Sequence, residues 1–101
     1  MALHCPATLL LAPAPRDTKG VAELAESLTG ERVLGVVRAP GDDVGRRLAE
    51  VLDVPLEDEP GLTAAEPPPS VLAEISDLHR GETVVVLVAA GEAPFVRHEI
   101  D

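Results

Sequence analysis

The order of apolar and polar positions along the chain predicts strands that alternate with helices. Apolar runs at 7–11, 33–37 and 83–88 lack the polar–apolar alternation of a half-exposed strand. Such runs are typical of strands that are buried on both faces, as in a parallel sheet. A shorter apolar stretch at 54–56 is expected to form a short edge strand.

Apolar residues at helical spacing predict helices over about 17–28, 42–52 and 70–78. Asp17 or Thr18 is expected to cap the first helix and Ser70 the third. The side chains expected to face the core are Val21, Leu24, Ala25 and Leu28 in the first helix, Val44, Leu48, Val51 and Leu52 in the second, and Val71, Ile75 and Leu78 in the third.

Two segments show neither the apolar run of a buried strand nor the apolar spacing of a helix. The stretch 57–69 is acidic and rich in proline, which predicts a surface loop. The tail 91–101 is compatible with a short helix or a loose end. The order of elements predicts an α/β fold with three layers, α/β/α, around a small, mostly parallel sheet of about three to four strands. The chain is expected to form a single domain over 1–101.

Composition excludes several classes of partner. The net charge is −10 and Lys19 is the only lysine, so the chain lacks the basic surface that binding to nucleic acid or to anionic lipid requires. Cys5 is the only cysteine, which rules out an intrachain disulfide and fits the reducing cytoplasm. The short apolar run near the start is expected to be a strand rather than a membrane span.

Four segments of the chain carry short motifs whose order and spacing are informative. They are T-K-G-V-A-E-L-A at 18–25, V-V-R-A-P at 36–40, L-A-E-V-L-D-V-P at 48–55 and H-R-G-E-T-V-V-V-L-V at 79–88. In the same order they resemble L-T-x-x-G-x-x-Q-A-x-x-L-A, V-Y-S-S-P, A-E-x-L-G-L-P and H-P-G-E-T-V-L-V-V-S. These patterns are those of the histidine phosphatase (phosphoglycerate mutase-like) superfamily, and the chain is most similar to its short SixA-like branch.

The resemblance implies a pocket at the carboxyl ends of the strands, from which the catalytic groups are missing. Ala14 stands where the family has its nucleophilic histidine, Pro13 where an arginine precedes it, Asp43 where the second loop has an arginine, and Ala90 where the second histidine lies. Phosphoryl transfer needs a positive clamp, so no catalytic residue is expected. The degenerate pocket is expected to comprise Pro13, Ala14, Pro15, Arg16, Arg38, Asp43, Ala90, Gly91 and Glu92.

The charged residues near this pocket have ordinary explanations. Arg16 and Arg38 could together bind an anion, but we expect both to be solvated charges at the rim. Arg46 and Arg47 are expected to pair with neighbouring carboxylates, Asp42, Asp43 or Glu50.

The histidines and the cysteine do not predict a metal site. His4 and Cys5 are adjacent, but His79 is expected at a helix end and His98 in the tail, too few ligands for zinc. Arg97, His98 and Glu99 resemble the family's Arg-His-Gly motif, which we interpret as coincidence because it lies at the wrong place in the order of elements.

The sequence therefore predicts a noncatalytic pseudoenzyme that acts as a protein-interaction, scaffold or regulatory module. Its expected partner is another protein or a second copy of itself, and no cofactor is expected. Two alternatives stay open: a binder of a small ligand or anion in the vacated pocket, and a phosphatase or phosphomutase that uses His98.

Overall fold

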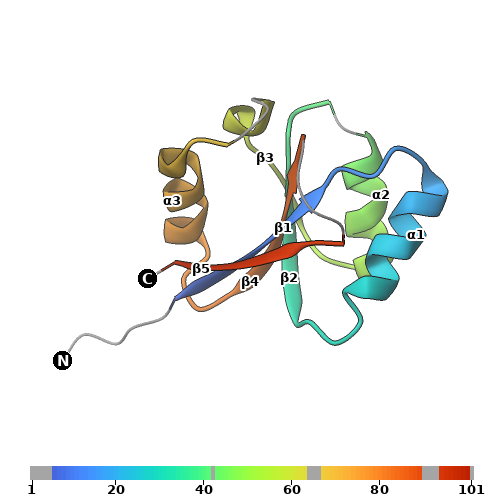
Figure 1. The fold of residues 1–101 in the computed structure, drawn as a ribbon, viewed down its shortest axis with the longest axis horizontal. Helices are drawn as coiled ribbons and strands as arrows, with labels where there is room; N and C mark the ends of the chain where they lie inside the picture. Colours follow the sequence, from blue (N-terminus) through green and yellow to red (C-terminus); the bar gives the residue numbers. More distant parts are fainter. Residues whose placement is uncertain (1–5, 42, 64–66, 90–93, 101) are drawn as a thin grey trace.

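The computed structural model describes residues 6–41, 43–63, 67–89 and 94–100 (Figure 1). Strands and helices alternate through most of the chain, as the pattern predicts. The elements are β1 (Ala7–Pro13), α1 (Thr18–Ser27), β2 (Val33–Arg38), α2 (Asp43–Leu52), β3 (Leu56–Asp58), the 3-10 helix η1 (Pro60–Thr63), α3 (Pro69–Leu78), β4 (Thr83–Val88) and β5 (Val96–Ile100).

The sheet has five strands in the order β3-β2-β4-β1-β5. The first four are parallel, whereas β5 runs antiparallel to β1. The α/β class is confirmed, but the sheet is larger than the predicted three to four strands because the tail adds one. The tail was expected to be a short helix or a loose end. It is instead a strand, with Val96 opposite Leu11 and Ile100 opposite Ala7.

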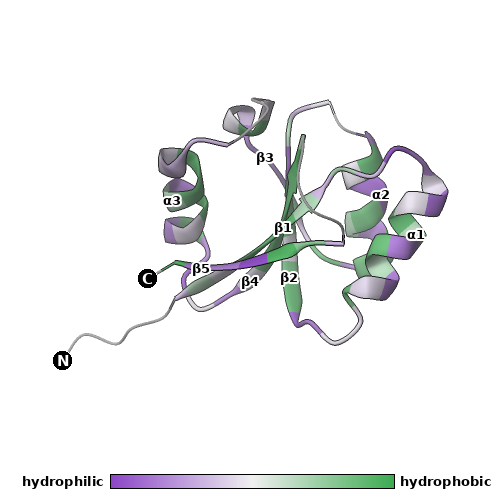
Figure 2. Ribbon diagram, in the orientation of Figure 1, coloured by the Kyte–Doolittle hydropathy of each residue, from purple (hydrophilic) through white to green (hydrophobic). Residues whose placement is uncertain are grey.

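The helices cover the two faces of the sheet unequally. Alternate residues of β1 point to opposite faces, so Leu10 packs with the core under α1 and α2, and Leu9 packs with the core under η1 and α3. Figure 1 shows α1 and α2 together on one side and α3 alone on the other. Figure 2 shows apolar residues concentrated along β1, β2 and β4 between these layers.

The first helix begins as predicted and the third does not. The Asp17 carboxylate accepts a hydrogen bond of 2.8 Å from the Gly20 amide, which identifies it as the cap of α1. The third helix begins at Pro69 after an extended Pro68, and Ser70 lies inside its first turn rather than at the cap. Proline suits this first position because its fixed φ is helical and its missing N–H would have no partner there.

Two side chains predicted to face the core are instead exposed. Val51 is 61% exposed and Leu78 is 74% exposed. In α2 the buried stripe is centred on Leu48 and Ala49, and Val51 lies roughly 100° round the helix from it. In α3 the buried residues are Ile75 and Ser76. The prediction for Ile75 is confirmed, whereas Leu78, the last residue of the helix, lies outside this buried stripe.

The predicted surface loop 57–69 contains structure. It begins with the rest of the edge strand β3 and continues into η1, whose Leu62 is buried in the core under α3. Gly61 lies so close to α3 that a Cβ built on it would stand 2.4 Å from Val71 Cγ2. The segment is therefore packed against the fold at this point. Among the described residues, no helix is long and apolar enough to cross a membrane.

Candidate functional site

The carboxyl ends of three neighbouring strands form the candidate site. β2, β4 and β1 are adjacent and parallel, so the segments after Arg38, Val88 and Pro13 leave the sheet on the same side. The Ala14 amide donates a hydrogen bond of 2.9 Å to the Val88 carbonyl, which fixes the segment after β1 against the end of β4. In an open α/β sheet this end is where ligand sites occur.

The structure brings only part of the predicted pocket together. Pro13, Ala14 and Pro15 are partly buried at the end of β1, whereas Arg16 is exposed in the turn that leads into α1. Ala90, Gly91 and Glu92 lie outside the described residues.

Arg38 is not a solvated rim charge, contrary to the prediction. The residue is 9% exposed, and its Nε donates a hydrogen bond of 2.6 Å to Asp58 Oδ1 on the neighbouring strand β3. The close approach of α2 explains the burial, because a Cβ on Gly45 would stand 3.1 Å from Arg38 Cβ. The arginine is held beneath α2 with its charge balanced by a carboxylate.

The charged residues of α2 face solvent. Asp43 is exposed at the first position of the helix. The predicted pairing of Arg46 and Arg47 with Asp43 or Glu50 is not formed among the described residues. Arg47 Nη1 instead donates a hydrogen bond of 3.2 Å to Thr18 Oγ1 at the start of α1. This contact links the two helices on one face of the sheet. Asp42, the other proposed partner, lies outside the described residues.

A groove of about 330 Å³ opens between the end of β1, one face of α1 and Pro94, which lies two residues before β5. Three prolines line it, two at the end of β1 and one from the segment before β5, together with a leucine and a glycine. The lining residues are Pro13, Pro15, Gly20, Glu23, Leu24, Ser27 and Pro94.

The described lining of this groove does not supply the groups of a phosphoryl-transfer site. Among the lining residues that the structure describes there is no histidine, cysteine or basic side chain, and Glu23 is the one charged residue. The Ser27 hydroxyl donates a hydrogen bond of 3.0 Å to the Glu23 carbonyl within α1, with no base beside it to activate it. The arrangement offers rigid apolar contact and one carboxylate at the rim. It is suited to binding by shape.

Sequence reasoning found Pro13 and Pro15 but missed the other walls of the groove. Gly20, Glu23 and Ser27 recur at intervals that place them on one face of a helix, and this spacing was a usable signal. Pro94 had no such signal, since its position depends on the pairing of β5 with β1.

His98 is not near this site. It lies on β5 opposite Leu9, in the middle of β1, whereas the groove lies beyond the end of β1 at Pro13. Its neighbour Arg97 is ion-paired with Glu31 in the turn before β2. His98 does not line the groove, so the groove does not support the alternative of a phosphatase that uses this residue.

A polar cluster lies away from the groove, at the carboxyl end of α3. His79 caps the helix and is 9% exposed. Its Nδ1 lies 2.8 Å from Glu82 Oε1, and its Nε2 lies 3.0 Å from Glu57 Oε1 on β3. The second contact does not have hydrogen-bond geometry, so it acts through charge. Burial lowers the pKa of His79, but the hydrogen bond with Glu82 and the negative charges of Glu57 and Glu82 outweigh burial and raise the pKa above its usual 6.5.

This raised pKa predicts a pH-dependent stability. A group whose pKa is higher in the folded protein contributes its full stability below pH 6.5, the unfolded value, and loses it as pH rises through the folded pKa. We expect the free energy of unfolding of the native protein to fall as the pH rises from 6.5 through the folded pKa of His79, and we expect a smaller fall in His79→Gln. The measurement is urea unfolding at a series of pH values between about 5 and 9, within the range where histidines titrate. Parallel pH curves for the two proteins would contradict this role of His79.

Within the ranges that the structure describes, there is no group of three or more histidine, cysteine, aspartate or glutamate side chains placed to hold a metal ion. His4 and Cys5 lie outside those ranges.

No family model, curated protein or solved structure matches the chain. The similarity to the histidine phosphatase superfamily therefore stays a prediction from the sequence.

Proposed function

We propose that this protein is a noncatalytic interaction module of the histidine phosphatase type, and that it uses the proline-lined groove to hold an apolar side chain of a protein partner. The observation that carries this proposal is the chemistry of the groove, whose described lining residues include three prolines, Leu24 and the carboxylate of Glu23. Arg38, at the same end of the sheet but two strands away on β2, supports the same reading because it is buried in a pair with Asp58.

The groove favours a partner of defined chemistry. Proline walls lose little conformational freedom when a partner binds, so an apolar side chain can be held at low entropic cost. Glu23 at the rim and the net charge of −10 favour a basic residue next to that side chain. The preferred segment of the partner therefore carries a leucine-like residue flanked by arginine or lysine.

A small apolar ligand is the second candidate, because the groove volume of about 330 Å³ falls at the lower end of the range for small-molecule sites. An anion is less suited to this place, because the described lining carries Glu23 and no basic side chain. Of the two arginines predicted to bind an anion, Arg16 is exposed and Arg38 is paired with Asp58.

The test is binding of two short peptides, Arg-Leu-Arg and Glu-Leu-Glu with blocked ends, followed by amide chemical shifts. We expect the first peptide to shift the amides of Gly20, Leu24 and Ser27, and the second to bind at least about tenfold more weakly because of repulsion by Glu23 and the overall charge. Ser27→Trp should fill the groove and abolish the shifts. Ala22→Trp is the matched control, since Ala22 is exposed on the same helix and does not line the groove.

Two outcomes would count against the proposal. Equal effects of Ser27→Trp and Ala22→Trp would place the binding elsewhere. Hydrolysis of a generic phosphomonoester that disappears in His98→Ala would show that the protein is an enzyme. Native mass spectrometry of the protein from its host separates the two candidates, since a retained mass of a few hundred daltons favours the small ligand.

A further inference from the structure

The two edges of the sheet differ in length and charge. β3 forms one edge with only three residues, two of which are the acidic Glu57 and Asp58; Glu59 follows, and Pro60 begins the next 3-10 helix. Shortness, like charges and proline all discourage a sheet edge from pairing with another strand. β5 forms the other edge with five residues and no proline. Within the described residues, no strand pairs with the outer side of β5.

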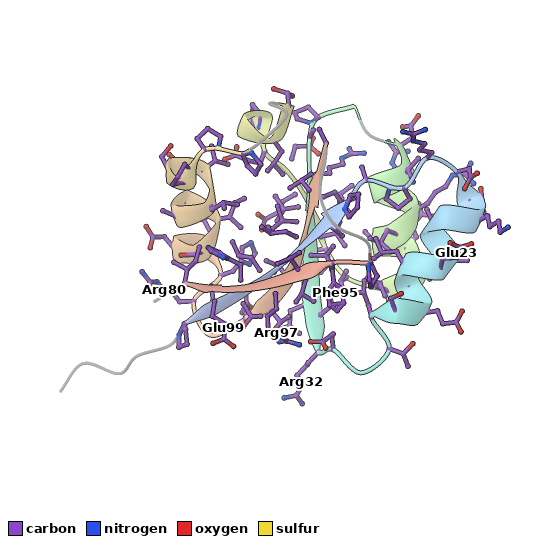
Figure 3. The ribbon with its side chains drawn as sticks, in the orientation of Figure 1. Glu23, Arg32, Arg80, Phe95, Arg97 and Glu99 are labelled. Carbon is purple, nitrogen blue, oxygen red and sulfur yellow. The ribbon has the colours of Figure 1, made fainter. Side chains whose placement is uncertain are left out.

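The β5 edge is accessible and electrically balanced. Residues 96–99 are exposed, and Val96, at 42% exposure, is one of the few large apolar side chains on the surface. Arg97 and Glu99 are the two formal charges of the strand and cancel, whereas the whole chain carries −10. Figure 3 shows these two side chains close together along β5. The strand itself therefore adds no net charge to a contact at this edge, unlike the acidic β3 edge.

We propose that β5 pairs antiparallel with β5 of a second copy, about a twofold axis at His98, to join two sheets into one. In this register Arg97 lies opposite Glu99 of the second copy, and Val96 lies opposite Ile100 of the second copy. The twofold symmetry repeats each pair, so both charged pairs have opposite signs and both outer pairs are apolar. Opposite charges and β-branched side chains directly across an antiparallel pair are both stabilising.

The sequence of β5 selects this register over its neighbours. A twofold axis perpendicular to the sheet pairs residues whose side chains lie on the same face of the sheet. The axis must therefore pass through a residue of β5, and a different register moves the axis to another residue. With the axis at Arg97, two arginines would be opposite each other, and with the axis at Glu99, two glutamates would be. Only the axis at His98 pairs all of Val96–Ile100 without like charges.

The expected dimer is weak. A single pair of five-residue strands buries less surface than the roughly 1,200–2,000 Å² of a stable interface. We therefore expect a dissociation constant of about 10–100 μM, in the range of transient association. The inference goes beyond the proposed function, because it names a second copy as a partner and uses a surface on the opposite side of β5 from β1. It stands even if the groove binds nothing.

The first test is sedimentation equilibrium of the full chain over a range of about 5–500 μM, chosen to bracket the expected dissociation constant. The native protein should change from the monomer mass of 10.5 kDa to twice that mass. Glu99→Arg should weaken association at least about tenfold, since it replaces two attractive pairs with two repulsive ones. The matched control is Glu26→Arg, which makes the same charge change at an exposed position of α1.

A charge exchange provides the rescue. Arg97→Glu combined with Glu99→Arg restores opposite charges across the axis, and adding Glu31→Arg keeps the ion pair that residue 97 makes within the copy. We expect this triple variant to dimerise within about threefold of the native protein. A native protein that stays monomeric throughout the range would overturn the proposal, as would equal effects of Glu99→Arg and Glu26→Arg.

The second test fixes the register by disulfide capture in a Cys5→Ser background. With the axis at His98, the two copies of that residue have Cα atoms about 4.5–5.5 Å apart, within the range that a disulfide spans. His98→Cys should therefore form a covalent dimer under mild oxidation. Val96→Cys should not, because its two copies would be roughly 14 Å apart along the strands. Equal cross-linking of the two variants would show that the strands do not pair in this register.

Discussion

Leu10→Ala is expected to lower the free energy of unfolding by about 3 kcal/mol, the largest effect of any substitution considered. Leu10 is fully buried in β1, between β4 and β5, and packs in the core under α1 and α2. The substitution removes apolar contacts and leaves a cavity that the surrounding strands cannot close. A small domain has a total stability of about 5–10 kcal/mol, so the variant should lose a large part of it.

The measurement for Leu10→Ala is urea unfolding followed by far-ultraviolet circular dichroism, since the chain has no tryptophan to report by fluorescence. Leu34→Ala is the matched control. Leu34 also lies in a predicted buried strand, but it is 45% exposed on β2, so its loss should cost less than about 1 kcal/mol. Equal losses in the two variants would contradict the assignment of Leu10 to the centre of the core.

Arg38→Ala is expected to lower the free energy of unfolding by about 2 kcal/mol. The substitution removes the ion pair with Asp58 and the packing of the arginine stem beneath Gly45 of α2. The loss should be smaller than for a fully buried pair, because the Asp58 side chain is 51% exposed and water can solvate the carboxylate that remains. The same unfolding experiment provides the value.

Arg16→Ala is the control for Arg38→Ala, because Arg16 is exposed and its loss should change stability by less than about 0.5 kcal/mol. Titration with inorganic phosphate, followed by amide chemical shifts, separates a structural role from an anion site. We expect neither arginine variant to change the response to phosphate. A loss of phosphate binding in Arg38→Ala without a loss of stability would restore the alternative of an anion-binding pocket.

The candidate site was predictable only in part. Pro13, Ala14 and Pro15 could be placed at a strand end because a buried apolar run stops there, and such ends are where sites form in α/β folds. Arg38 was assigned to the rim because a charged residue after a strand is usually solvated. Its burial depends on Gly45, which allows α2 to approach, and on Asp58, which arrives through the pairing of β2 with β3.

The groove shows the same division. The spacing of Gly20, Glu23 and Ser27 fixes one face of α1 in the sequence. The opposing wall at Pro94 exists only because β5 returns antiparallel to β1 and brings that residue beside the end of the first strand. A contact between positions so far apart in the chain leaves no local pattern from which it could be predicted.

By itself, the sequence determined the α/β class and the positions of most helices and strands, together with the net charge of −10. These properties follow from local period and composition, which each segment carries whatever its neighbours do. Only the tertiary structure decided that the tail is a strand. Val96–Ile100 is short and exposed at the sheet edge, so its conformation comes from hydrogen bonds to β1 rather than from burial. Tertiary packing also decided which charged residues are solvated and which are buried, because a side chain's access to water depends on the elements packed above it.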